Sequence, residues 1–237
     1  MGGRSMLFGA VILLGLHCFG QDKSPATFGS VTAVDFKVAV PGGDTAADAV
    51  VISDVGVKTF DPGSYTSSRW LGNLQHTKRI LILKRRGFEA ATVTIPLQVS
   101  KSDHEEITGL KAATYNLENG IVVKTDLDKN SIFKIKVSDN WVAERFTFPA
   151  VREGSIVEFT YSEVSPFVIS DNSWTFQGAY PCLWSEYTAT IPGVFGFSSA
   201  EKPALPFCIK TSDVKQADLG QNYGGIRTFH WAVKDAP

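Results

Sequence analysis

The chain has 237 residues, of which 43% are apolar and 20% charged, and its net charge is −1. This balance is that of an ordinary globular protein and excludes a disordered chain. A net charge this small provides no electrostatic attraction to nucleic acid or to an anionic membrane, so we expect no nucleic-acid partner.

The first 20 residues predict a targeting segment rather than part of the fold. Arg4 supplies a positive charge, and residues 6–16 form an apolar run. The run is shorter than the ~20 residues that span a membrane but suits the apolar part of a signal peptide. Small residues at Cys18 and Gly20 fit cleavage before Gln21. We therefore expect a cleaved signal peptide at 1–20.

Cleavage there predicts a protein exported to the periplasm or the cell surface, with no transmembrane segment in the mature chain 21–237. Two alternatives remain open. Retention of the apolar run as a membrane anchor would require a longer run. Lipidation of Cys18 would require a small residue before it, and the sequence has His17 there.

The remaining chain alternates apolar and polar residues with the period of β-strands. The clearest runs lie at residues 92–97, 133–137, 157–162 and 186–191. Each alternation predicts a strand with its apolar face on a core and its polar face in water. A continuous apolar run at 80–83 predicts a central strand that is covered on both faces.

Turn residues separate these runs. Asn119-Gly120 stands between two short strand-like segments, and the pair readily adopts the positive φ angles of a tight hairpin turn. Pro62-Gly63, Arg86-Gly87 and Pro192-Gly193 mark other reversals. Helical periodicity is nearly absent. These patterns predict one all-β domain over residues 21–237, an antiparallel β-sandwich-like fold.

Two cysteines follow the signal peptide. Cys182 and Cys208 could form a disulfide in an oxidising compartment, or remain as buried thiols. Cys182 could also form a thiol-based catalytic pair with His230, although it does not follow the pattern of a nucleophile at a helix N-terminus. The histidines of the mature chain do not stand at metal-ligand spacing, so we expect no metal and no cofactor.

Aromatic residues provide a further candidate site. Of the five tryptophans, Trp141, Trp174 and Trp184 could line a face that binds a glycan or a peptide. The alternative is that they pack in the core and under loops, as most tryptophans in β domains do.

A series of segments carries a resemblance to a known family. The segments are 109–120 (GLKAATYNLENG), 126–129 (DLDK), 148–161 (FPAVREGSIVEFTY) and 184–187 (WSEY). Their order and spacing resemble domain of unknown function 3857 (DUF3857). Members of that family commonly precede a transglutaminase-like cysteine peptidase core in exported proteins of Gram-negative bacteria.

The resemblance covers nearly the whole mature chain and implies a β-sandwich accessory domain. It also implies that a catalytic Cys, His and Asp would lie downstream. No position of this sequence matches the transglutaminase motif, so no catalytic residue is carried over. Family members continue where this chain stops at Pro237. We therefore expect either a fragment of a longer protein or a relative truncated at its C-terminal end.

Three functional hypotheses follow. The first is a non-catalytic accessory or binding domain, with a downstream transglutaminase-like domain or an envelope protein as partner. The second is a stand-alone module that binds glycans or peptides. The third is a thiol enzyme that uses Cys182 and His230.

Overall fold

The computed structural model describes residues 27–62, 69–169, 173–197, 200, 205–215 and 225–237. The signal peptide expected at 1–20 lies outside these residues. Within them, no helix is both long and apolar enough to cross a membrane.

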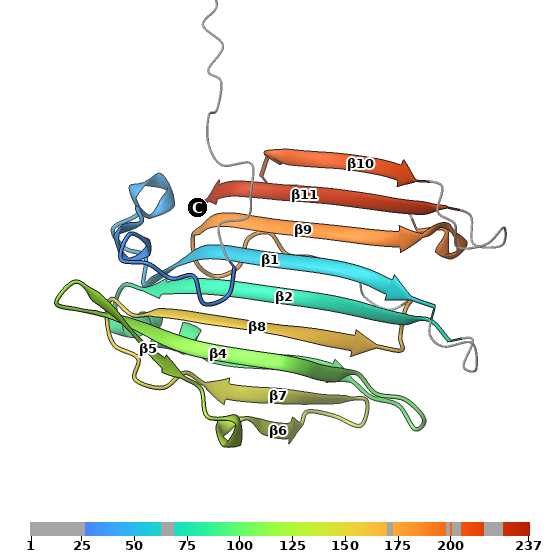
Figure 1. The fold of residues 1–237 in the computed structure, drawn as a ribbon, viewed down its shortest axis with the longest axis horizontal. Coiled ribbons are helices and arrows are strands. Elements are labelled where there is room, and N and C mark those ends of the chain that lie inside the picture. The colour runs from blue at the N-terminus through green and yellow to red at the C-terminus, as the bar shows by residue number, and fades with distance from the viewer. Residues whose placement is uncertain (1–26, 63–68, 170–172, 198–199, 201–204, 216–224) are drawn as a thin grey trace, which may run out of the picture.

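Within the described residues, eight strands form the larger of two sheets (Figure 1). Their order across the sheet is β10 (Ile209–Lys215), β11 (Ile226–Ala236), β9 (Cys182–Pro192), β1 (Ala49–Asp61), β2 (Leu71–Ile82), β8 (Ile156–Ser165), β4 (Glu106–Glu118) and β5 (Ile121–Asp126). The all-β prediction is confirmed. The sheet is mixed rather than purely antiparallel, however, because β1 and β9 run parallel. The two strands lie far apart in the chain, so local alternation could not reveal this pairing.

The smaller sheet is antiparallel and has three strands. Their order is β3 (Thr92–Gln98), β7 (Trp141–Thr147) and β6 (Phe133–Lys136). Short 3-10 turns complete the described elements: η1 (Asp35–Lys37), η2 (Pro41–Gly43), η3 (Arg85–Ala91), η4 (Lys129–Ser131) and η5 (Gly193–Phe195).

The small sheet packs on one face of the large sheet, which we call the inner face. Ile95, Leu97 and Phe146 of the small sheet share one buried cluster with Ile80 and Phe159 of the large sheet. The residues that alternate along β8 toward this cluster, including Phe159, are buried as predicted. The apolar positions that alternate along β8 in the sequence therefore form part of the core between the two sheets.

The N-terminal segment 27–48 covers part of the opposite, outer face. Phe28 and Phe36 of this segment pack against Val50, Leu81 and Ile156. Ile80 and Ile82 point to the inner cluster, so β2 is covered on both faces here, as its continuous apolar run predicts.

A buried ion pair joins this segment to the sheet. Arg79 on β2 and Glu158 on β8 lie opposite each other and are 1% and 0% exposed. Arg79 donates from Nη2 to Glu158 Oε1 at 2.7 Å. The other oxygen of Glu158 accepts from the Gly29 amide at 2.8 Å and from the Tyr115 hydroxyl at 3.1 Å.

The tight hairpin predicted at Asn119-Gly120 is confirmed, since it joins β4 to β5 and both residues have positive φ angles, 50° and 84°. The prediction for residues 133–137 is wrong in one respect. The strand forms as β6, but its apolar face does not meet a core: Phe133, Ile135 and Val137 are exposed. β6 is the edge of a sheet of only three strands, and no described layer covers this face.

Candidate functional site

A polar cluster lies on the inner face of the large sheet, where β1, β2 and β8 are neighbours. His76 lies opposite Tyr161, and Asp54 lies opposite Lys78. His76 Nε2 is 2.6 Å from Asp54 Oδ1, and His76 Nδ1 is 3.1 Å from the Tyr161 hydroxyl. Lys78 Nζ donates to Asp54 Oδ2 at 2.6 Å. Strand register alone therefore assembles a carboxylate, an imidazole, an amine and a phenol.

The electrostatics of this cluster favour an ionised aspartate. Burial acts to raise the pKa of Asp54, but the hydrogen bond and charge of His76, together with Lys78, hold that pKa below its ordinary value. Burial and nearby carboxylates raise the pKa of Tyr161, which stays a neutral phenol. Both nitrogens of His76 have protein partners, the Asp54 carboxylate at Nε2 and the Tyr161 hydroxyl at Nδ1.

Trp174 covers the cluster from the segment that precedes β9. Its indole packs edge-on against His76 and stacks on Tyr187, with ring centroids 5.1 Å apart in each case. Its Nε1 donates to Ser185 Oγ at 3.1 Å. The ring lies directly over Gly56 of β1, where an added Cβ would stand 2.8 Å from ring atoms Cε3 and Cη2. The close approach of indole to strand therefore requires glycine at 56.

Replacing Gly56 with alanine is expected to destabilise the fold by about 1–3 kcal/mol, because the methyl group overlaps the indole of Trp174. Gly178→Ala is the matched control, since a Cβ at Gly178 meets nothing within 4 Å. Urea denaturation measures both. In a Trp174→Ala background the cost of Gly56→Ala should largely disappear; an unchanged cost would contradict the packing argument.

A second group of charged residues lies farther along the same face. Lys58 on β1 is buried, and its Nζ extends over Gly72, where an added Cβ would stand 3.1 Å from it. Burial lowers the pKa of Lys58, and the charges of Glu163 and Glu105 partly oppose this. Burial and Glu105 raise the pKa of Glu163. Sequence reasoning missed both groups, because single charged residues in alternating strands carry no local signal of being brought together.

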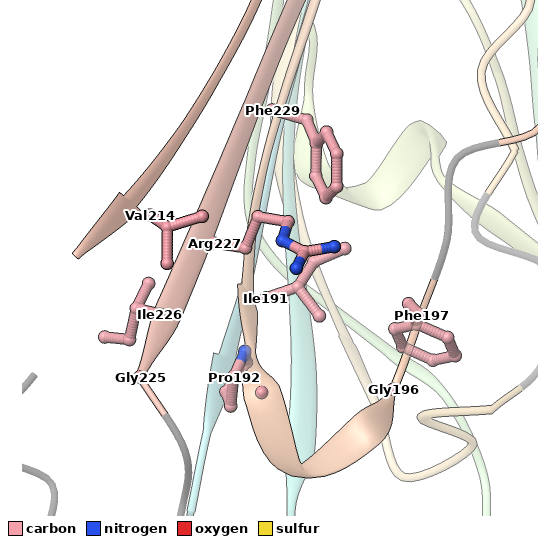
Figure 2. Close-up of a pocket in the computed structure, with 10 residues that line it drawn as sticks. Ile191, Pro192, Gly196, Phe197, Val214, Gly225, Ile226, Arg227 and Phe229 are labelled. Atoms are coloured by element: carbon pink, nitrogen blue, oxygen red, sulfur yellow. The ribbon is translucent and has the colours of Figure 1, made fainter. Parts of the chain in front are cut away.

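A hollow of about 230 Å³ opens where β9 and β10 end and β11 begins (Figure 2). Apolar side chains form most of its wall, among them Ile191, Phe197, Val214 and Phe229. Arg227 contributes the charged group, with its guanidinium 5.8 Å from the centroid of the Phe229 ring. Figure 2 shows this side chain lying between Ile191 and Phe229. The described lining offers apolar contact and one cation, but no nucleophile or general base.

The structure does not bring Cys182 and His230 together. Cys182 lies opposite Ala236 and belongs to the inner core cluster. His230 lies opposite Thr188, several residues along the same strand pair, and bonds to Glu186 Oε1 at 2.7 Å. At about 3.3 Å per residue the two side chains are on the order of 20 Å apart. The pairing considered for a thiol enzyme is therefore not formed.

Cys182 and Cys208 are also not joined to each other in the part of the chain that the structure describes. Cys208 is exposed and lies beside Ala232 in the middle of β11, whereas Cys182 is buried opposite Ala236 at the C-terminal end of β11. The disulfide that the sequence leaves open is thus absent here. Burial, together with the negative charge of Asp54, raises the pKa of Cys182 to about 12.

We expect iodoacetamide at pH 8 to modify Cys208 at least ~100-fold faster than Cys182, because only a thiolate reacts and Cys182 is held as a buried thiol. Peptide mass mapping at timed intervals distinguishes the two sites. Urea-unfolded protein, in which both cysteines should react at similar rates, is the control. Faster labelling of Cys182 than of Cys208 in the folded protein would show an activated nucleophile and contradict this assignment.

The three candidate tryptophans lie on different surfaces. Trp141 is on β7 of the small sheet and is 41% exposed. Trp174 lies over the inner face of the large sheet. Trp184 is buried on β9, where its Nε1 donates to Glu186 Oε2 at 2.8 Å. They do not form one aromatic platform. Within the described ranges, histidine, cysteine and acidic side chains also form no group of three that could hold a metal ion.

Comparison with models of protein families shows to which family this chain belongs. The model for DUF3857, described as a domain of unknown function with a solved structure, matches residues 72–237. The chain belongs to the DUF3857 family. The match begins within β2, so the DUF3857 region includes the cluster residues His76, Lys78 and Tyr161, whereas Asp54 on β1 lies before it. Among curated proteins, no match is found.

Two solved structures are similar to this DUF3857 chain. A "putative protease" from Parabacteroides distasonis ATCC 8503 has a TM-score of 0.53 and 11% identity, over 80% of this chain and 36% of that one. A "putative nutrient binding protein" from Legionella pneumophila has a TM-score of 0.38 and 8% identity, over 84% of this chain and 66% of that one. The similarity to the Parabacteroides protein shows a shared fold. This chain spans about a third of the length of that protein.

Proposed function

We propose that this DUF3857 chain is a non-catalytic, exported accessory domain that accompanies a transglutaminase-like peptidase core or docks another envelope component. The observation that carries the proposal is the Parabacteroides structure. That protein is named a "putative protease", and the part that shares this fold is only 36% of its chain. An accessory domain attached to a larger enzyme fits this proportion.

The side chains of the domain support a non-catalytic role. The thiol of Cys182 is buried with a raised pKa, and His230 lies several residues away from it along the β9–β11 pair. A thiol nucleophile is activated by an adjacent base, by a lowered pKa or by a metal ion, whereas burial raises the pKa of Cys182. Such a domain would bind or orient a polypeptide and leave the chemistry to its partner.

An antibody raised against this domain tests the proposal on envelope fractions of the source cells. A band much heavier than the 25.8 kDa of this chain would support a domain joined to a peptidase core. A band at about 24 kDa, the size after removal of a signal peptide, would overturn the covalent link to a peptidase core. Cross-linking of that band to an envelope protein would then support docking to another envelope component, and its absence would overturn the proposal. Peptide hydrolysis by the purified domain that is lost in Cys182→Ser would contradict the non-catalytic role.

A further inference from the structure

The exposed face of the small sheet at β6 carries a row of apolar side chains, which we call the β6 stripe: Phe133 and Ile135 on β6, Val137 just after it, and Trp141 at the start of β7. Their exposed fractions are 63%, 36%, 61% and 41%. Phe133 and Ile135 alternate along β6 and Val137 continues the alternation; the amide of Val137 bonds to the carbonyl of Trp141 at 3.0 Å, which places Trp141 beside them. Single exposed apolar residues are ordinary, but a contiguous row marks an interaction surface.

The same strand has an open backbone edge. The sheet order is β3-β7-β6, and among the described residues β6 pairs only with β7. Figure 1 shows β6 at the margin of the ribbon, with no labelled strand beyond it. A free edge presents unpaired backbone donors and acceptors, onto which another extended chain can add as a strand.

We propose that β6 binds an extended segment of a partner polypeptide in which apolar residues alternate with acidic ones. Lys134 and Lys136 lie between the residues of the β6 stripe and point to the opposite face of the strand. An added strand with this alternation would place its apolar side chains beside the stripe and its carboxylates beside the two lysines. Opposite charges across a strand pair stabilise it.

The lysines argue against a second copy of this chain as the occupant. Two β6 strands paired with each other would bring their lysines together, and like charges across a strand pair are destabilising. Lysines on an edge strand commonly discourage self-association in this way. The edge of β6 therefore disfavours pairing with β6 of a second copy and favours pairing with an acidic strand.

This inference deepens the proposed function, because it names the surface by which an accessory domain would hold a polypeptide. It rests on the geometry of β6, however, and can fail while the accessory role holds. The size of the native protein tests the accessory role, and the peptide experiment below tests β6 alone.

The probe is an end-capped octapeptide of four Val-Glu repeats, titrated into the isotopically labelled protein and followed by amide NMR shifts. We expect shifts at residues 133–137 and at the Trp141 indole. An octapeptide of four Val-Lys repeats should bind roughly tenfold more weakly, because it places like charges beside Lys134 and Lys136. A Val-Glu peptide with a central proline, which cannot complete the backbone ladder, should also lose affinity.

The double variant Lys134→Glu/Lys136→Glu should reverse this preference in favour of the Val-Lys peptide. Lys134 lies opposite Glu144, so the neutral variant Lys134→Gln/Lys136→Gln serves as a second test that avoids repulsion within the sheet. It should lose the preference for the Val-Glu peptide, because Glu144 opposite position 134 and Asp139, which bonds to Lys136 at 2.8 Å in the wild type, remain. The proposal is overturned if the wild-type protein binds both charged peptides equally, if shifts appear at the β5 or β10 edge instead, or if millimolar peptide shifts no amide of β6.

Discussion

Replacing Arg79 with methionine is expected to lower the free energy of unfolding by about 3–5 kcal/mol, because it leaves the carboxylate of Glu158 buried without its cation. Glu158 is 0% exposed and accepts from Arg79 at 2.7 and 3.0 Å. The substitution also removes the hydrogen bonds from Arg79 to the Thr27 carbonyl and the Ser30 hydroxyl. Urea denaturation followed by circular dichroism measures the loss.

Two variants separate the charge from the packing. Arg79→Met/Glu158→Leu removes both charges and should recover part of the lost stability, because a buried ion pair costs desolvation that apolar side chains avoid, while the Tyr115 hydroxyl and the Gly29 amide lose their acceptor. Arg145→Met removes an exposed arginine from β7 and should change stability by no more than about 0.5 kcal/mol. A loss below about 1 kcal/mol in Arg79→Met would show that Glu158 does not depend on this partner.

A second large effect is expected from Phe146→Ala, which should cost about 3–5 kcal/mol by opening a cavity between the two sheets. Phe146 on β7 is 1% exposed. Its ring lies edge-on to Phe148 at 5.5 Å and to Phe159 of β8 at 6.3 Å between centroids. It is thus one of the side chains through which the small sheet packs on the large one.

Phe133→Ala is the matched control, because Phe133 lies in the same small sheet but is 63% exposed. It should change stability by no more than about 0.5 kcal/mol. Denaturation is followed by far-UV circular dichroism and by tryptophan fluorescence. Equal costs for the two phenylalanines would show that Phe146 does not couple the sheets, and separate transitions by the two probes would show that the sheets unfold independently.

Local sequence patterns predict individual strands and turns well in this chain. The alternation at Val157, Phe159 and Tyr161 predicts a strand with one buried face, and all three side chains are buried in β8. Asn119-Gly120 predicts the hairpin between β4 and β5. These features depend on neighbouring residues and on backbone dihedral preferences, which a short stretch of sequence already contains.

The candidate sites are much less accessible to sequence reasoning. Cys182 and His230 attract interest as a thiol and an imidazole, yet they lie far apart along β9 and β11. Asp54 and His76 show no motif, yet the register of β1 and β2 places them 2.6 Å apart. Side-chain chemistry can be read from the sequence, but proximity depends on strand pairing between distant segments.

The sequence by itself determined that the chain folds as strands, where several of them turn and which faces of most strands are apolar, because those properties follow from local alternation and turn chemistry. Only the tertiary structure decided that β1 pairs in parallel with β9, that Arg79 and Glu158 meet in the interior, and that the apolar face of β6 stays exposed. Each of these depends on which distant segment covers or pairs with a strand. Alternation shows that a face is apolar, whereas the arrangement of the layers determines whether that face is buried.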